Sequence, residues 1–213
     1  MPFFPLFVDI KDKNCIFIGG GKVAARKIET LVEFGARIRV ISPDAVETIT
    51  KLNMENKLEY IKREYRGGDI DGAFLVFAAT SDRDLNERVY QEAVRRNIFV
   101  NVADSPKECT FVFPSIISRD ELVIGISTSG SYPALSKKIR MKIDEMLPKS
   151  TGDWFGVLKE YRKKAAEKIK DEEKRKRFLN ELLDMVIDSQ DNRSDIEYKI
   201  KGLFEVYKNE EEN

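Results

Sequence analysis

Residues 14–27 read NCIFIGGGKVAARK and carry the strongest indication of the fold. The first half of this stretch is an apolar run of strand length, and its second half carries apolar residues at helical spacing. Three consecutive glycines, Gly19, Gly20 and Gly21, join the two halves. A strand that turns through glycines directly into a helix is typical of a loop that binds phosphate groups. We therefore expect a parallel sheet with a ligand site at this turn.

The first hundred residues continue this alternation of strands and helices. The expected strands are residues 14–18, 37–41, 58–62, 73–80 and 98–103, and the expected helices are residues 23–34, 44–52 and 82–96. Such alternation predicts an α/β fold with a Rossmann-like, doubly wound parallel sheet.

The rhythm changes after residue 104. Residues 110–117 and 121–128 predict a pair of antiparallel strands that turn at Arg119-Asp120, and a helix is expected from Pro133 to Pro148. No later segment resembles a strand. The expected parts are a Rossmann-like domain over residues 1–104, a strand-pair and helix segment over 105–148, and a helical domain over 149–213.

The glycines fit the dinucleotide-binding pattern Gly19-x-Gly21-x-x-Ala24. Gly19 permits the tight turn, Gly21 lets the backbone approach a pyrophosphate, and Ala24 is small enough for close packing of the helix on the sheet. The helix N-terminus, including Gly20, Lys22 and Val23, offers N–H groups to phosphates. Lys22 could contact a phosphate or be a solvated lysine, and a glycine-rich turn without a ligand is the structural alternative.

The end of the second strand distinguishes NAD from NADP. It is followed by Ser42, Pro43 and Asp44, and Asp44 lies three residues beyond the expected strand end. A carboxylate here binds the ribose 2′-hydroxyl of NAD, and no arginine follows immediately to hold a 2′-phosphate. The sequence therefore favours NAD. Thr80, which ends the apolar strand, is expected to border the cofactor and can also cap the next helix.

Three linked blocks point to a family. GGGKVAARK continues through LVEFGARIRVISPD, and NVADSPKECTFVFPSII and ISTSGSYPAL follow later. Together they resemble the dehydrogenase/ferrochelatase family of sirohaem synthesis, precorrin-2 dehydrogenase, over residues 2 to about 148. This resemblance implies NAD-dependent oxidation of precorrin-2 to sirohydrochlorin. In some members of the family the same site then inserts Fe²⁺, as a substrate, to give sirohaem.

The resemblance also implies a catalytic residue, because the family's essential aspartate in the NVxD segment matches Asp104. Hydride loss from a reduced tetrapyrrole is coupled to proton loss, and a carboxylate at the end of a sheet strand is a suitable base. The chain contains no histidine, so Asp104 is also the strongest candidate to guide a metal ion. No dedicated metal cage is expected beyond it. Asp104 could instead be a turn residue before Ser105-Pro106.

Substrate contacts are expected nearby. Asn101 would lie near the same mouth, where it could orient the substrate or cap a loop. The segment Thr128-Ser129-Gly130 is rich in hydroxyl and N–H groups and precedes a helix, so it suits the carboxylates of a tetrapyrrole. It could equally be an ordinary helix N-cap.

The helical C-terminal region suggests a partner subunit. Its apolar residues are expected to pack against a second subunit or the first domain: Trp154, Phe155, Phe178, Leu182, Met185 and Val186. The resemblance implies a homodimer formed through this region, and residues 105–148 are also expected to be a dimerisation and substrate segment. Charges alternate in sign along residues 159–177, which indicates a solvated helical face.

Composition excludes several other classes of protein. Lys plus Arg and Asp plus Glu both number 37, which argues against a general nucleic-acid binder. The longest apolar run, Ala73 to Ala79, is far short of the roughly 20 residues of a membrane helix. The N-terminus lacks a basic region and carries Asp9, and Cys15 in an apolar run reads as a buried thiol. We therefore expect a cytoplasmic protein without a nucleic-acid or membrane partner.

Two other functions fit part of the sequence. An NAD(H)-sensing regulatory module without turnover would explain residues 14–100 equally well, but not Asp104 or residues 110–134. An oxidoreductase for a small carbonyl or hydroxy substrate lacks a visible Tyr/Lys or His/Arg dyad.

Overall fold

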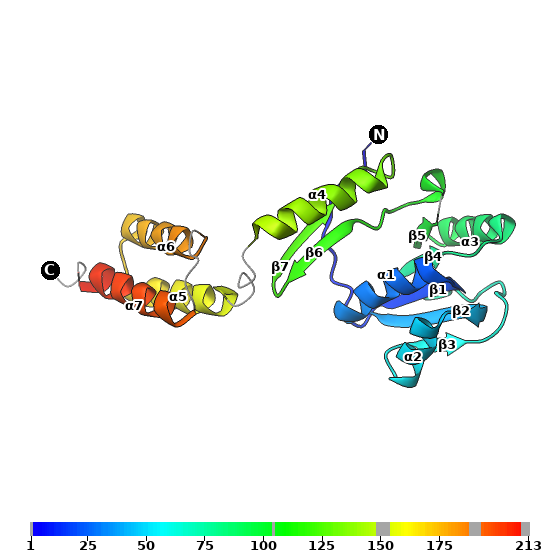
Figure 1. The fold of residues 1–213 in the computed structure, drawn as a ribbon, viewed down its shortest axis with the longest axis horizontal. Helices are drawn as coiled ribbons and strands as arrows, with labels where there is room; N and C mark the ends of the chain where they lie inside the picture. Colours follow the sequence, from blue (N-terminus) through cyan, green and yellow to red (C-terminus); the bar gives the residue numbers. More distant parts are fainter. Residues whose placement is uncertain (1, 104, 148–153, 188–192, 210–213) are drawn as a thin grey trace. The chain divides into compact units, whose positions relative to one another are not determined.

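The computed structural model describes residues 2–103, 105–147, 154–187 and 193–209 (Figure 1). The chain divides into two compact units. Unit 1 comprises Met1–Pro114 with Ser127–Pro133, and unit 2 comprises Ser115–Ile126 with Ala134–Asn213. Residues 104, 148 and 149, at the boundaries expected from the sequence, lie outside the described residues.

Unit 1 contains a five-stranded parallel sheet in the order β3-β2-β1-β4-β5. Its strands are β1 (Asn14–Gly20), β2 (Arg37–Ala45), β3 (Glu59–Ile61), β4 (Leu75–Ala78) and β5 (Phe99–Val102). Its helices are α1 (Lys22–Glu33), α2 (Glu47–Met54) and α3 (Arg83–Arg95). The chain winds outward from β1 to β3, then returns to β4 on the other side of β1. This reversal confirms the doubly wound, Rossmann-like α/β fold.

Alternate residues of β1 face two hydrophobic cores. Cys15 and Phe17 pack with α1 and α2 on one face of the sheet, whereas Ile16 and Ile18 pack with α3 on the other. The rings of Phe17 and Phe77 stack with their centroids 4.3 Å apart. Cys15 is fully buried, as predicted, and this burial raises the pKa of its thiol to about 11.

Strand β2 is longer than the sequence predicts. It continues to Ala45, which pairs with Gly20, and the N–H of Val46 donates to the carbonyl of Gly20 at 2.9 Å. The prediction that Asp44 lies three residues beyond the strand is therefore wrong, and α2 begins at Glu47 rather than at residue 44. The cause is the extra pairing of Ala45 with Gly20 at the end of β1, which no local pattern in β2 reveals.

The segment after β5 is not the strand expected from residue 110. A short 3₁₀ helix, η1 (Pro106–Glu108), comes first, and β6 begins only at Ser115. Phe111 and Phe113 instead pack edge-to-face on Phe77, with centroid distances of 5.4 and 5.9 Å. The alternating apolar residues that indicated a strand are used here to fill the core.

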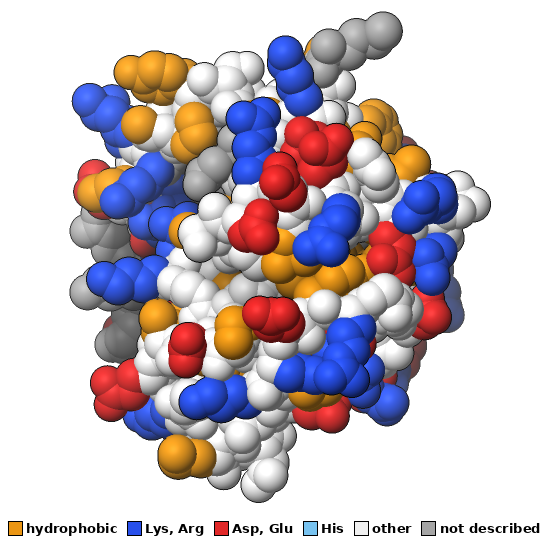
Figure 2. Space-filling view, turned by 90° about the vertical axis from the view of Figure 1, so that its right-hand side faces the viewer, with side chains coloured by type: hydrophobic (Ala, Val, Ile, Leu, Met, Phe, Trp, Pro, Cys, Tyr) orange, Lys and Arg blue, Asp and Glu red, His pale blue; other side chains and the backbone are white. Residues whose placement is uncertain are grey.

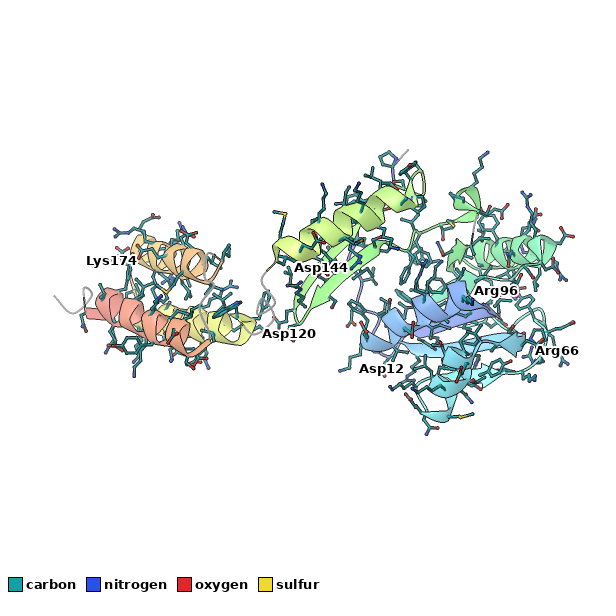
Figure 3. The ribbon with its side chains drawn as sticks, viewed as in Figure 1. Asp12, Arg66, Arg96, Asp120, Asp144 and Lys174 are labelled. Atoms are coloured by element: carbon teal, nitrogen blue, oxygen red, sulfur yellow. The ribbon has the colours of Figure 1, made fainter. Side chains whose placement is uncertain are left out.

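In unit 2, β6 (Ser115–Arg119) pairs antiparallel with β7 (Leu122–Ile126), as predicted. The turn falls at residues 120–121, one residue later than predicted, and Asp120 has a φ of 57°. Helix α4 (Pro133–Met146) follows. The guanidinium of Arg119 donates to the Asp144 carboxylate at 2.8 Å, which ties β6 to α4 (Figure 3).

Helices α5 (Trp154–Lys168), α6 (Glu172–Ile187) and α7 (Arg193–Asn209) share a core of their own. Trp154, Phe178, Leu182 and Val186 are buried in it, with Met185 packed against it, so the prediction that they face a second subunit or the first domain is wrong. Phe155 is half-buried. The prediction of a helical domain did not divide it into helices, so it did not reveal that α7 supplies part of this core.

The charged run 159–177 is not one helix. It breaks between α5 and α6, where Ile169 is fully buried and the Asp171 carboxylate accepts from the N–H of Lys174 at 2.7 Å. Its charges pair along the surface, for example Lys164 with Glu160. The face in view in Figure 2 belongs to unit 1 rather than to this run, and cationic and anionic side chains are interleaved on it as well.

Candidate functional site

The candidate site lies where the carboxyl ends of β1, β2 and β4 meet. The glycine loop, defined here as Gly19 to Ala24, leads from β1 into α1. β1 and β4 are neighbours at the point where the strand order reverses. Open α/β sheets bind ligands in the crevice at such a point.

Gly19 and Gly20 are required by packing within the protein. Gly19 has a φ of +108°, and a Cβ there would come within 2.5 Å of the carbonyl oxygen of Ala79. A Cβ on Gly20 would come within 2.5 Å of the carbonyl oxygen of Asp44. The ends of β4 and β2 therefore close on the glycine loop from two sides.

Gly21 is different, because packing does not explain it. Its φ of −80° suits any residue, and a Cβ there would meet nothing within 4 Å. It is the N-cap of α1, so the helix supplies no acceptor for the first N–H groups that follow. The open space beside a bare helix N-terminus fits a phosphate group, which the helix dipole also favours.

The rest of the glycine loop supports this fit. Lys22 and Val23 are exposed, and no acidic side chain lies in the first turn of α1. Ala24 is fully buried between α1 and the sheet, where a larger side chain would push the helix away. The residues present therefore fit the pyrophosphate of a dinucleotide.

Residues 42–44 border the glycine loop on the β2 side. The hydroxyl of Ser42 donates to the carbonyl of Asp44 at 2.7 Å, and that carbonyl faces Gly20. Pro43 and the Asp44 side chain are exposed. The pKa of the Tyr60 hydroxyl is raised, mainly because the group is partly buried and to a smaller extent because the negative charge of Asp44 lies nearby. An exposed carboxylate next to a phosphate-binding loop can accept hydrogen bonds from ribose hydroxyls.

Thr80 borders the glycine loop on the β4 side, and Asn86 of α3 holds it. The Asn86 carbonyl oxygen accepts from the Thr80 hydroxyl at 2.8 Å and from its N–H at 3.2 Å. Asp82 caps α3 by accepting from the N–H of Leu85 at 3.0 Å. Asn86 was not among the site residues predicted from the sequence. The sequence does contain an indication of it. Asn86 is polar and disfavours a helix, yet it stands at a position where the helical spacing of residues 82–96 faces the core.

Asn101 of β5 is buried, and both ends of its amide contact the protein. The ammonium of Lys27 donates to its carbonyl oxygen, and its amide nitrogen donates to the carbonyl of Phe111 at 3.1 Å. Lys27 also lies over the rings of Phe77 and Phe113, at 5.5 and 5.8 Å from their centroids. Asn101 thus holds the segment that follows η1 against β5. Asp104, the expected catalytic residue, lies outside the described residues.

The loop at residues 127–132 satisfies many of its own N–H groups. The Thr128 hydroxyl accepts from the N–H of Tyr132 at 3.1 Å, and the Ser127 hydroxyl accepts from the N–H of Ser129 at 3.0 Å. The Ser129 hydroxyl accepts from the N–H of Phe3 at 3.1 Å. Gly130, with a φ of +80°, packs on Pro106 just beyond β5.

The structure therefore brings the predicted cofactor residues together. Gly19, Gly20, Gly21, Lys22, Val23, Ala24, Ser42, Pro43, Asp44 and Thr80 all lie at or beside the glycine loop. Across the described ranges, no three carboxylate or thiol side chains cluster as a metal site would require. Among the described helices, none contains an apolar stretch that could span a lipid bilayer.

A family model for putative NAD(P)-binding domains matches residues 6–115, more than half of the chain. The chain belongs to this family. The match begins before β1 and ends as β6 begins, so it contains the whole parallel sheet and the glycine loop.

Curated relatives carry one shared name. The chain is 38% identical over 184 residues to a siroheme synthase from Thioalkalivibrio sulfidiphilus, which covers 86% of this chain and 38% of that protein. It is 39% identical over 178 residues to a siroheme synthase from Neisseria meningitidis serogroup C, covering 84% and 37%. The chain thus spans about two fifths of the length of these curated relatives.

A solved structure of SirC, a precorrin-2 dehydrogenase, has the same fold. It matches this chain with a TM-score of 0.75 and 23% sequence identity, covering 94% of this chain and 100% of that one. At this level of identity the likeness concerns the arrangement of the elements.

Proposed function

We propose that this protein oxidises precorrin-2 to sirohydrochlorin with NAD, as a step of sirohaem synthesis. One observation carries the proposal: an open dinucleotide loop, with Gly21 facing empty space, in a chain 38% identical to a siroheme synthase. The name of the SirC structure, which shares the fold, agrees with the oxidation step.

The proposed roles on the cofactor side follow from the packing of the glycine loop. The N–H groups after Gly21, together with Lys22, bind the pyrophosphate, and Asp44 accepts from the adenosine ribose. Thr80 forms the wall on the β4 side. When bound, NAD supplies the acceptor for a hydride. An exposed carboxylate at Asp44 repels the 2′-phosphate of NADP, which is why we propose NAD.

Asp104 is the proposed base. Oxidation of precorrin-2 removes a hydride and a proton from the substrate, and a carboxylate that follows a sheet strand is suited to take the proton. Asp104 comes two residues after the end of β5 in the sequence. We propose that Asn101 and Thr128-Ser129-Gly130 contribute to binding the carboxylate-rich tetrapyrrole.

Fe²⁺ insertion into sirohydrochlorin is the second proposed activity, with the ion as a substrate guided by Asp104. The name siroheme synthase, shared by the relatives, supports it. We also propose a cytoplasmic homodimer. Exposed apolar side chains on α4, including Leu135, Ile139 and Met146, support pairing through the segment 105–148. We likewise propose that the chain is divided after residues 104 and 148 into an NAD-binding domain, this segment and a helical domain.

Replacement of Asp104 by asparagine tests the catalytic role. Asp104→Asn should lower kcat for NAD-dependent oxidation by about 100-fold or more, because the proton acceptor is lost. NAD affinity, measured by calorimetry, should not change. The matched control is Asp120→Asn, which removes one carboxylate at the β6–β7 turn (Figure 3) and should leave kcat unchanged. Full turnover by Asp104→Asn would remove it from the mechanism.

Two further outcomes separate the alternatives. If the wild-type protein binds NAD but oxidises no precorrin-2, the NAD(H)-sensing function takes its place. If oxidation proceeds but added Fe²⁺ enters sirohydrochlorin no faster than without protein, the protein is a dehydrogenase alone.

A further inference from the structure

Asn86 is a buried polar residue whose amide is committed to a single neighbour. Its exposed fraction is 6%. Asparagine is also an unfavourable residue within a helix, so its presence in α3 needs a reason. Its carbonyl oxygen accepts from both the N–H and the hydroxyl of Thr80, and its amide nitrogen donates to the Thr80 carbonyl at 3.1 Å. The amide of asparagine can accept a hydrogen bond from the backbone N–H of a residue and donate one to its backbone C=O at the same time.

Thr80 in turn lies against the glycine loop. A Cβ on Gly19 would come within 3.0 Å of the backbone nitrogen of Thr80, directly after the closer contact with Ala79. The Thr80 hydroxyl also accepts from the N–H of Asp82, the cap of α3, at 3.2 Å. The position of Thr80 beside the glycine loop is therefore held from α3. Open α/β sheets have their ligand crevice at these carboxyl ends of the strands.

The two sides of this crevice serve different halves of a dinucleotide. The β2 side carries Asp44, which suits the adenosine ribose, and the β4 side carries Thr80. Asn86 contacts only the β4 side. A substitution at Asn86 should consequently weaken the binding of the half of the ligand that extends past β4.

We propose that Asn86 is a positioning residue for the nicotinamide half of the bound dinucleotide, acting through Thr80. The inference rests on the proposed NAD binding and adds a residue that the glycine pattern does not contain. Without its amide, the N–H and C=O of Thr80 lose their partner, and Thr80, two residues beyond the end of β4, is no longer held beside the glycine loop.

The test compares two ligands on one variant. Asn86→Leu replaces the amide with an apolar side chain of similar size in the same buried position. The dissociation constants of NAD and AMP are measured by calorimetry. NAD binding should weaken about 10-fold, whereas AMP binding, which uses only the β2 side and the glycine loop, should change less than 2-fold. Asn86→Asp, which keeps the acceptor for the Thr80 N–H, should recover part of the NAD affinity.

The matched control is Arg88→Leu, an exposed position two residues further along α3, which should bind both ligands as the wild type does. Equal NAD affinity in Asn86→Leu, or an equal loss for NAD and AMP, would overturn the positioning role. If Asn86→Leu does not fold, Asn86→Asp, which loses the amide donor to the Thr80 carbonyl but keeps the acceptor, gives the same comparison with a smaller expected loss of NAD affinity. A wild-type protein that binds no NAD would instead overturn the proposed function.

Discussion

The glycine loop and the loop at residues 127–132 both have the composition of an anion site, but they differ in what their polar groups do. In the glycine loop, the first N–H groups of α1 have no acceptor in the helix, and Gly21 borders open space. In the second loop, hydroxyls of Ser127, Thr128 and Ser129 accept from backbone N–H groups of the protein.

This contrast shows that composition alone does not identify an anion site. Glycines, serines and threonines mark both a loop that binds a ligand and a loop that caps itself. What distinguishes them is whether the donors already have partners. The glycine loop meets that criterion for phosphate, whereas binding of substrate carboxylates by Thr128-Ser129-Gly130 depends on the hydroxyl protons.

The sharpest test of the contrast is a charge in the open space. Gly21→Asp should weaken NAD binding about 100-fold or more, because the carboxylate would occupy and repel the pyrophosphate position. The fold should persist, since a Cβ at Gly21 meets nothing within 4 Å. Calorimetry and a thermal melt measure the two quantities. Unchanged NAD affinity would mean that the glycine loop binds something else.

A second test separates the glycines from one another. Gly19→Ala should lower the free energy of unfolding by about 2–4 kcal/mol, because the φ of +108° and the contact with Ala79 exclude a side chain. Gly21→Ala should change it by less than about 0.5 kcal/mol. Urea unfolding of both variants gives the comparison. Equal losses would contradict the distinction between a packing glycine and a ligand glycine.

The smallest expected effect belongs to the self-capped loop. Thr128→Val removes the hydroxyl that accepts from Tyr132 and should cost about 1 kcal/mol of stability, as the loss of a cap does. It should raise KM for precorrin-2 roughly threefold, the size of one weak hydrogen bond, and leave NAD affinity unchanged. A weakened NAD affinity would show that the two loops are not independent.

The sequence predicted the parts of the fold that depend on local pattern. Residues 14–18 form an apolar run of strand length, the turn is made of glycines, and the next residues have helical spacing. Each of these local patterns is typical of one kind of element. The predicted cofactor residues came together for the same reason, since the ends of parallel strands share one edge of the sheet.

The errors arose where tertiary contacts overrule local pattern. β2 continues to Ala45 because it pairs with Gly20, and Phe111 and Phe113 pack on Phe77 rather than in a strand. The buried apolar residues of α5, α6 and α7 pack with one another in one core. Asn86 was missed because its role requires knowledge of which backbone it faces.

NAD-dependent oxidation of precorrin-2 is tested by an anaerobic absorbance time course of the wild-type protein with precorrin-2 and NAD, with parallel reactions containing NADP or no nucleotide. We expect conversion to sirohydrochlorin with NAD, much slower conversion with NADP, and none above background without nucleotide. If a sample that binds NAD by calorimetry shows no protein-dependent conversion, the protein is not a precorrin-2 dehydrogenase.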